Sequence, residues 1–237
     1  GGGAGPNWLD TINEAFIPDY GYDGSWGPAL EGQNASHWDS WFVGDPEYGK
    51  ARPWEANPTN VEDFFRTGVT FTNNFAVTGG GENTSYRLSY TNHNQTGTQE
   101  NSELRRNLLS FTGGAKISDK LTSNVNINYA KTNALGRPLT GYSESVMSQF
   151  NQWFQRQLNM DRLREYENPD GSQRTWNPND AVNGDMAPHY WDNPFWERYK
   201  NVENDSRERV YGSLGMTYQI NDWLSLTGRG MTGLYTD

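Results

Sequence analysis

Apolar and polar residues alternate with a period of two in several stretches of the chain. One parity of residues 69–78 carries large apolar side chains, and the other carries mainly threonine and asparagine. Beyond a glycine-rich stretch at 79–83, Tyr86, Leu88 and Tyr90 share one parity and oppose serine, arginine and threonine. Alternation of this kind is typical of β-strands with one apolar face. Residues 64–93 therefore predict a β-hairpin.

The same pattern recurs twice. Residues 105–118 and 121–129 alternate on either side of a turn at 119–120, and residues 210–220 alternate before a turn at 221–222. The last stretch, 223–235, has an alternation blurred by its glycines. We therefore expect six strands in three hairpins, joined in an antiparallel up-and-down order.

The connections between the predicted strands differ greatly in length. The turns within hairpins are short, whereas the links 94–104 and 136–205 are long. A meander then places the short turns at one end and the long loops at the other, as in outer-membrane barrels. Asn124, Asn126 and Asn128 suit a wet lumen, and Tyr218 and Trp223 flank a short turn as interfacial aromatic residues do.

Composition narrows the function classes. Of 237 residues, 33% are hydrophobic and 14% aromatic, with a mean hydropathy of −0.93, and no apolar run is long enough for a membrane-spanning helix. The net charge of −10 argues against a nucleic-acid partner, and without cysteine there is no disulfide. A soluble antiparallel sheet with one solvated face would show the same alternation, so that alternative stays open.

Several segments resemble one family. Residues 63–92, "DFFRTGVTFTNNFAVTGGGENTSYRLSYTN", resemble a signature hairpin of the SusC/RagA family of TonB-dependent outer-membrane transporters from Bacteroidetes, and residues 101–132 are similar to the hairpin that follows it. "SWGPALEGQ" (25–33) resembles the Gly/Pro-rich segment before that hairpin, and "NPFW" (193–196) resembles a loop before a descending strand.

The resemblance implies an all-β fold, in which the chain is an antiparallel up-and-down segment of a transmembrane β-barrel of about 22 strands with long extracellular loops. Four segments are expected: an extracellular loop or early barrel segment (1–63), two barrel hairpins (64–135), a long extracellular loop with a short helix (136–205), and a last barrel hairpin (206–237). The plug domain is expected to lie outside this chain.

The resemblance also implies partners. These are a SusD-like surface lipoprotein that acts as a lid, the TonB–ExbB–ExbD complex through a missing N-terminal part, outer-membrane lipid, and a glycan or peptide substrate. No cofactor is expected. The implied location is the outer membrane of a Gram-negative bacterium.

Catalytic signatures are absent from the sequence. His37, His93 and His189 are far apart, none has a metal-ligand spacing, and each is expected to be exposed in a loop or at a strand end. No pair of carboxylates stands out. We therefore expect a protein that is not an enzyme.

The long loop carries the candidate site. Residues 145–167 predict a short amphipathic helix, with apolar residues at helical spacing from Val146 to Leu158. Residues 171–199 are dense in Trp, Asn, Asp and Pro, and aromatic rings beside amides and carboxylates can bind sugars or peptides. These rings could instead pack the loop onto itself or onto a partner. The candidate ligand-contact or lid-contact residues are Trp153, Phe154, Trp176, Tyr190, Trp191, Phe195 and Trp196.

Three functions are therefore considered. The first is the barrel wall of a SusC-like importer. The second is a soluble β-sandwich that binds carbohydrate through exposed tryptophans. The third, a secreted β-rich glycosidase with two carboxylates, has the least support because no acid pair is recognisable.

Overall fold

A computed structural model describes residues 8–12, 14–142 and 145–237 of the chain. The secondary structure is mainly β, with a few short helices. The chain forms two compact units. One contains 68–97, 102–137 and 204–237 and is called the sheet unit here; the other contains 1–67, 98–101 and 138–203 and is called the loop unit.

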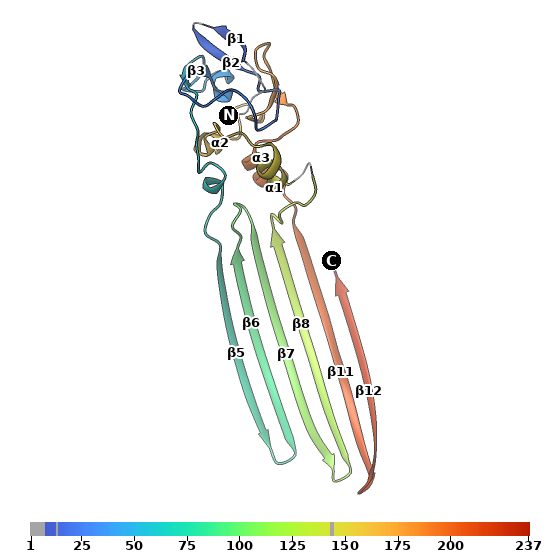
Figure 1. The fold of residues 1–237 in the computed structure, drawn as a ribbon. Helices are drawn as coiled ribbons and strands as arrows, with labels where there is room; N and C mark the ends of the chain where they lie inside the picture. The colour runs from blue at the N-terminus through green and yellow to red at the C-terminus, as the bar shows by residue number, and fades with distance from the viewer. Residues whose placement is uncertain (1–7, 13, 143–144) are drawn as a thin grey trace. The chain divides into compact units, whose positions relative to one another are not determined.

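The sheet unit is one antiparallel sheet of six strands in the order β12-β11-β8-β7-β6-β5 (Figure 1). Each strand pairs with the neighbouring strand in chain order within this unit, so the six strands form an up-and-down meander. The predicted six strands in three hairpins are confirmed. The strands are β5 (Val69–Gly81), β6 (Thr84–Thr96), β7 (Glu103–Ser118), β8 (Leu121–Leu135), β11 (Asp205–Asn221) and β12 (Leu224–Thr236).

Two of the three hairpin turns differ from the predicted ones. The glycines at 79–81 belong to β5, and the turn is formed by residues 82–83. A Cβ on Gly80 would lie 2.5 Å from the Thr84 carbonyl oxygen, so the close approach of the two strands requires glycine there. The last turn is at 222–223, because a bulge after Gln219 moves the final pair to Asn221 and Leu224.

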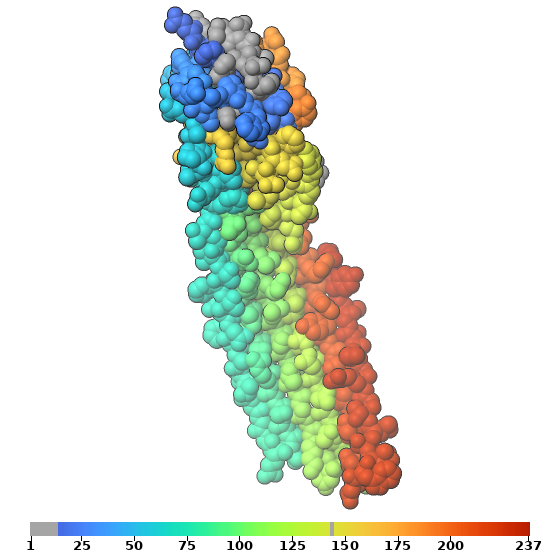
Figure 2. All heavy atoms as spheres, in the orientation of Figure 1, coloured from blue at the N-terminus to red at the C-terminus, as the bar shows by residue number. Residues whose placement is uncertain are grey.

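The strand register sorts the side chains onto two faces. In Figure 2 the strands lie side by side, from teal β5 to red β12. Cross-strand neighbours on one face form apolar rows, of which the clearest runs across all six strands: Phe75, Tyr90, Leu109, Tyr129, Val210 and Leu234. We call this the apolar face.

The opposite face, called the polar face, is linked by side-chain hydrogen bonds between strands. Asn74 Nδ2 donates to Thr91 Oγ1 at 2.5 Å, and Ser110 Oγ donates to Asn128 Oδ1 at 2.7 Å. Asn126 Nδ2 donates to a threonine hydroxyl on β7 at 3.1 Å. Such cross-strand pairs stabilise the sheet on the side where apolar contacts are few.

The loop unit combines short strands, single helical turns and irregular segments. A four-stranded sheet contains β1 (Trp8–Ile12), β2 (Ala15–Pro18), β3 (Asn34–Ser36) and β4 (Ala51–Pro53), and β9 (Pro178–Asp180) pairs with β10 (Asp185–Pro188). The helical segments are η1 (Trp38–Trp41), η2 (Glu62–Phe64), α1 (Val146–Ser148), η3 (Gln149–Trp153), α2 (Met160–Leu163) and α3 (Pro194–Tyr199).

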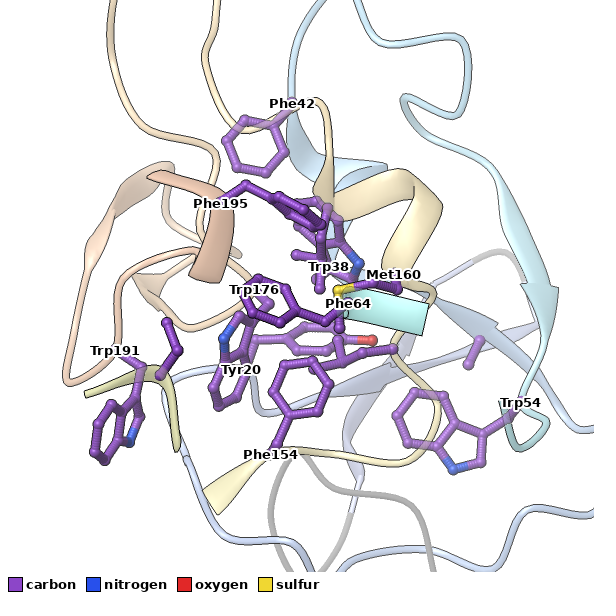
Figure 3. Close-up of a cluster of buried hydrophobic side chains, with 14 residues drawn as sticks. Tyr20, Trp38, Phe42, Trp54, Phe64, Phe154, Met160, Trp176, Trp191 and Phe195 are labelled. Atoms are coloured by element: carbon purple, nitrogen blue, oxygen red, sulfur yellow. The ribbon is translucent and has the colours of Figure 1, made fainter. Parts of the chain in front are cut away.

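An aromatic core holds the loop unit together (Figure 3). Trp54, Phe64 and Trp176 are completely buried, and the Phe64 ring lies 5.1 Å from Phe195 and 4.8 Å from Phe150 between centroids. These contacts join residues far apart in the sequence. Segments 1–63 and 136–205, which the sequence presents as separate loops, therefore share one core.

The helix predicted over 145–167 is interrupted. Helical structure extends from Val146 to Trp153, stops at Phe154, and resumes only at Met160. The buried Asn60 side chain binds the intervening backbone: its Nδ2 donates to the carbonyl oxygens of Gln155 (2.9 Å) and Leu158 (3.1 Å). Because those carbonyls are satisfied by Asn60, the segment does not need helical hydrogen bonds.

The "NPFW" segment was expected to be a loop, and this is wrong. It begins helix α3, because the Asn193 side chain accepts a hydrogen bond from Phe195 N at 2.8 Å and Pro194 occupies the first helical position. None of the helices in the described part of the chain has the length and apolar character needed to span a bilayer.

We predict that Phe64→Ala lowers the free energy of unfolding of the loop unit by about 3–5 kcal/mol, because it leaves a cavity in the aromatic core. Denaturant titration of tryptophan fluorescence on the purified protein measures this. Val43→Ala is the matched control: Val43 is 81% exposed, so its truncation should change stability by no more than about 0.5 kcal/mol. Equal effects of the two variants would contradict the assigned core.

Candidate functional site

The apolar face of the sheet unit is the first candidate functional surface among the described residues. Its side chains are exposed although they are large and hydrophobic: Phe75 is 69% exposed, Val77 62%, Leu226 66% and Leu234 74%. Soluble monomers rarely expose contiguous apolar patches larger than a few hundred Å². Exposed apolar surface of this kind marks a site that another protein, a ligand or lipid covers.

The apolar face has a defined height. On β11 its exposed apolar side chains extend from Val210 to Ile220, about 33 Å along the strand at roughly 3.3 Å per residue. Towards the loop end the next row on this face is polar, and contains Asn73, Asn92, Asn107, Lys131 and Glu208.

Tyrosine and tryptophan mark the two borders of this apolar face. Tyr90 lies in the last apolar row, and its hydroxyl donates to Asn107 Oδ1 at 2.7 Å. At the turn end Trp223 is 81% exposed and Tyr218 is 46% exposed. Aromatic residues with a polar tip are the type found where an apolar layer meets water.

The seven aromatic residues singled out in the long loop fall into two groups. Phe154, Trp176, Trp191 and Phe195 are buried, with 4% exposure or less, and belong to the aromatic core. Trp153 and Trp196 are half-buried, and Tyr190 is 61% exposed. Four of the seven rings therefore pack the loop onto itself, and the other three have a surface that a ligand or partner can reach.

Trp153 belongs to a small aromatic cluster that the sequence did not indicate. Tyr142, which is 59% exposed, lies 6.4 Å from the Trp153 ring and 6.0 Å from the Trp191 ring between centroids. Trp191 Nε1 donates to Asp23 Oδ2 at 2.8 Å, which fixes the indole. Tyr142 and Asp23 are 119 positions apart in the chain, so only the tertiary fold could bring them together.

Tyr190 lies beside His189 rather than in that cluster. The two rings stack with centroids 3.8 Å apart, and His189 Nδ1 is 3.0 Å from the Gly21 carbonyl oxygen. A Cβ on Gly21 would lie 2.9 Å from the Asn179 carbonyl oxygen. Glycine therefore allows residues 19–21 to approach the second half of the loop unit closely.

A shallow pocket of about 380 Å³ lies between residues 17–21 and 179–183. Asp19, Asp180 and Asn183 line it, and the Asp180 carboxylate accepts hydrogen bonds from the backbone and side-chain nitrogens of Asn183. No cluster of His, Cys, Asp and Glu among the described residues could hold a metal ion. The pocket therefore offers oxygen and amide groups to a small polar molecule.

A network of buried ion pairs connects residues 39–52 to residues 162–174. Arg162 Nε lies 2.9 Å from Asp39 Oδ2, and its Nη2 lies 2.6 Å from Asp45 Oδ1. Arg52 also pairs with Asp39, and Arg174 with Asp45. Both aspartate side chains are completely buried. Because an unpaired buried charge is costly, this network fixes the relative position of the two segments within the loop unit.

Burial and hydrogen bonding act in opposite directions on Asp45. Burial raises the pKa of its carboxyl. The hydrogen bonds from the Glu47 backbone N–H and from the Arg174 and Arg162 guanidinium groups together lower this pKa by more than burial raises it, so the net shift is downward. The lower pKa means that the folded state favours the charged carboxylate.

The three histidines were expected to be exposed, and for His37 this is wrong. His37 is 9% exposed, and its Nε2 lies 3.1 Å from the Pro53 carbonyl oxygen. Burial, together with the nearby Arg52, lowers its pKa, which favours the neutral ring. His93 lies within β6 beside Thr72 and is half-buried rather than exposed, whereas His189 is exposed as expected.

We predict that Asp45→Asn destabilises the loop unit by about 3 kcal/mol at pH 7, because the buried Arg174 loses its nearest carboxylate and Arg162 keeps Asp39 but loses its second buried partner. Since the folded pKa of Asp45 is lowered, its contribution is fully present above the usual value of 3.8 and is lost as the pH falls through the folded pKa. The difference in stability between wild type and variant should therefore stay constant from pH 7 to about pH 4 and narrow as the pH is lowered below 3.8. Asp161→Asn is the control, since its side chain is 88% exposed and should give a small, flat difference. A pH-independent gap for Asp45→Asn would contradict this role.

A scan against protein-family models finds no family that matches this chain, and a search of curated proteins finds no match.

Proposed function

We propose that the sheet unit is part of the wall of a TonB-dependent outer-membrane transporter of the SusC/RagA type. The single observation that supports this most is the exposed apolar face, which has a polar row at one end and aromatic residues at both borders. Lipid is the environment in which such a face is stable.

The dimensions of the strands agree with this proposal. A transmembrane β-strand needs about 9–11 residues, and the apolar band of an outer-membrane barrel is about 25 Å tall. The six strands have 13 to 17 residues. Each is long enough to cross the apolar layer at a tilt and continue into the polar zone.

The polar face supports the same proposal. Its asparagine, serine and threonine side chains bond to one another across strands, and they suit a wet or plug-filled lumen. A soluble sandwich would instead need a second sheet against the apolar face, and the described residues of the sheet unit form only one sheet.

The remaining parts of the proposed function extend beyond this chain. β5 and β12 are the two edges of the sheet, and a barrel of about 22 strands would pair both with further strands. Such a barrel would import a glycan or oligopeptide with energy supplied through TonB–ExbB–ExbD, beneath a SusD-like lipoprotein lid. The exposed rings of Tyr142 and Tyr190 and the half-buried rings of Trp153 and Trp196 are candidates for contact with lid or substrate.

We expect a charged residue to disturb membrane assembly on one face only. Leu88→Lys and Ile127→Lys place an ammonium group on the apolar face and should lower the amount of assembled protein in outer membranes several-fold, since a lysine facing lipid costs about 2–4 kcal/mol. Asn124→Lys is the matched control, because Asn124 is exposed on the polar face of the strand that carries Ile127. Quantitative immunoblots of membrane fractions measure the effect, and equal tolerance on both faces would argue against lipid contact.

The proposal as a whole is tested by fractionating cells that express the full-length parent and extracting the outer membrane with mild detergent. We expect the parent in that fraction, together with a stoichiometric surface lipoprotein identified by mass spectrometry. Recovery as a soluble monomer without a membrane partner would contradict the transporter and favour the carbohydrate-binding module.

A further inference from the structure

The polar face carries positive charge although the chain is acidic overall. The whole chain has a net charge of −10, with 29 acidic and 19 basic residues. On the polar face, however, basic side chains predominate. They are Arg87, Arg106, Lys116, Arg207, Arg209 and Arg229. The carboxylates on this face among the described residues are Asp205 and Asp237, both near the loop end.

Both of these carboxylates are already paired. Asp237 pairs with Arg207, and Asp205 lies 2.8 Å from Arg137 Nη2. Lys116 is neutralised by Asp119 in the adjoining turn, at 2.8 Å. Four arginines of the polar face, in contrast, have no carboxylate partner among the described residues: Arg87, Arg106, Arg209 and Arg229.

The contacts of these arginines leave their charge available. Arg87 Nη1 donates to Ser89 Oγ at 2.8 Å, and Arg106 Nε donates to Thr132 Oγ1 at 3.3 Å. The guanidinium carbon of Arg209 lies 4.8 Å from the centre of the Tyr211 ring. Neutral partners orient a guanidinium group without cancelling its charge.

The apolar face shows the opposite behaviour. Its basic residues at the loop end are paired, Arg105 with Glu103 at 2.9 Å and Lys131 with Glu208 at 2.6 Å. Within the six strands, the described basic side chains that lack a carboxylate partner therefore lie on the polar face. A general excess of arginine in the strands does not explain this difference.

We propose that the polar face binds and guides an anionic oligosaccharide, one that bears carboxylate or sulfate groups. This inference rests on the proposed function, because it assigns the substrate class of that transporter. Arginine binds planar anions through two parallel hydrogen bonds. In a confined lumen, several unpaired arginines on one wall raise the local concentration of anions and favour their passage.

The groups between the arginines favour a sugar over an acidic peptide. Asn74, Thr91, Ser110, Asn126 and Asn128 present amides and hydroxyls across four adjacent strands. Such groups donate to and accept from the many hydroxyls of a saccharide. Tyr211 and Tyr235 lie on the same face near Arg209 and offer ring surface to a pyranose.

The test uses the full-length parent purified in detergent and isothermal titration calorimetry with tetragalacturonate, maltotetraose and tetraglutamate. Tetragalacturonate should bind at least about tenfold more tightly than either of the others, and its affinity should fall when NaCl is raised from about 50 to 300 mM. Arg106→Gln with Arg209→Gln should weaken tetragalacturonate binding about tenfold and leave maltotetraose binding unchanged.

Arg105→Gln is the matched control, because it removes the same charge from the same strand on the opposite face and should change neither affinity. Correct assembly of each variant is checked by its heat-dependent migration in gels. If the double variant does not assemble, each single replacement is measured alone, and each should weaken tetragalacturonate binding about threefold.

Equal affinity for charged and neutral tetrasaccharides, no change in the arginine variants, or tighter binding of tetraglutamate would each overturn the assignment. If the parent resides in the outer membrane but shows no preference for tetragalacturonate, only this inference fails. Recovery of the parent as a soluble protein would remove the proposed function as well.

Discussion

The two-residue repeat of a β-strand is the constraint on which the sheet unit depends. Because successive side chains point to opposite faces, the alternation of apolar and polar residues fixes which face each strand presents. The meander keeps that choice consistent across β5 to β12, so that Phe75 and Leu234, at opposite edges, lie in one row. A register shift of one residue in a single strand would place its apolar side chains among the asparagines.

The two units obtain their stability in different ways. The sheet unit leaves its large apolar side chains exposed and satisfies its backbone through strand pairing. The loop unit buries tryptophan and phenylalanine in a compact core and adds buried ion pairs between Asp39, Asp45 and three arginines. With only 33% hydrophobic residues, the chain supplies both the apolar face of the sheet unit and the core of the loop unit, because only the loop unit buries its apolar residues in a closed core.

Charge follows the same division within the sheet unit. Acidic groups on the strands are paired with basic neighbours, and the unpaired arginines lie among amides and hydroxyls on the polar face. One face is apolar, and the other is polar and carries the unpaired positive charge. The separation results from strand geometry, since residues as close as Arg105 and Arg106 face opposite environments.

The sequence by itself determined the six strands, their order and their two faces, because period-two alternation and short turns are local signals. It did not determine the loop unit, where Asn60 interrupts a helix more than 90 positions away and Phe64 packs on Phe195. Nor could it show that Phe154, Trp176, Trp191 and Phe195 are buried while Tyr142 and Tyr190 stay accessible. Aromatic residues serve a core and a binding surface equally well, and only tertiary contacts between distant segments decide which role each ring takes.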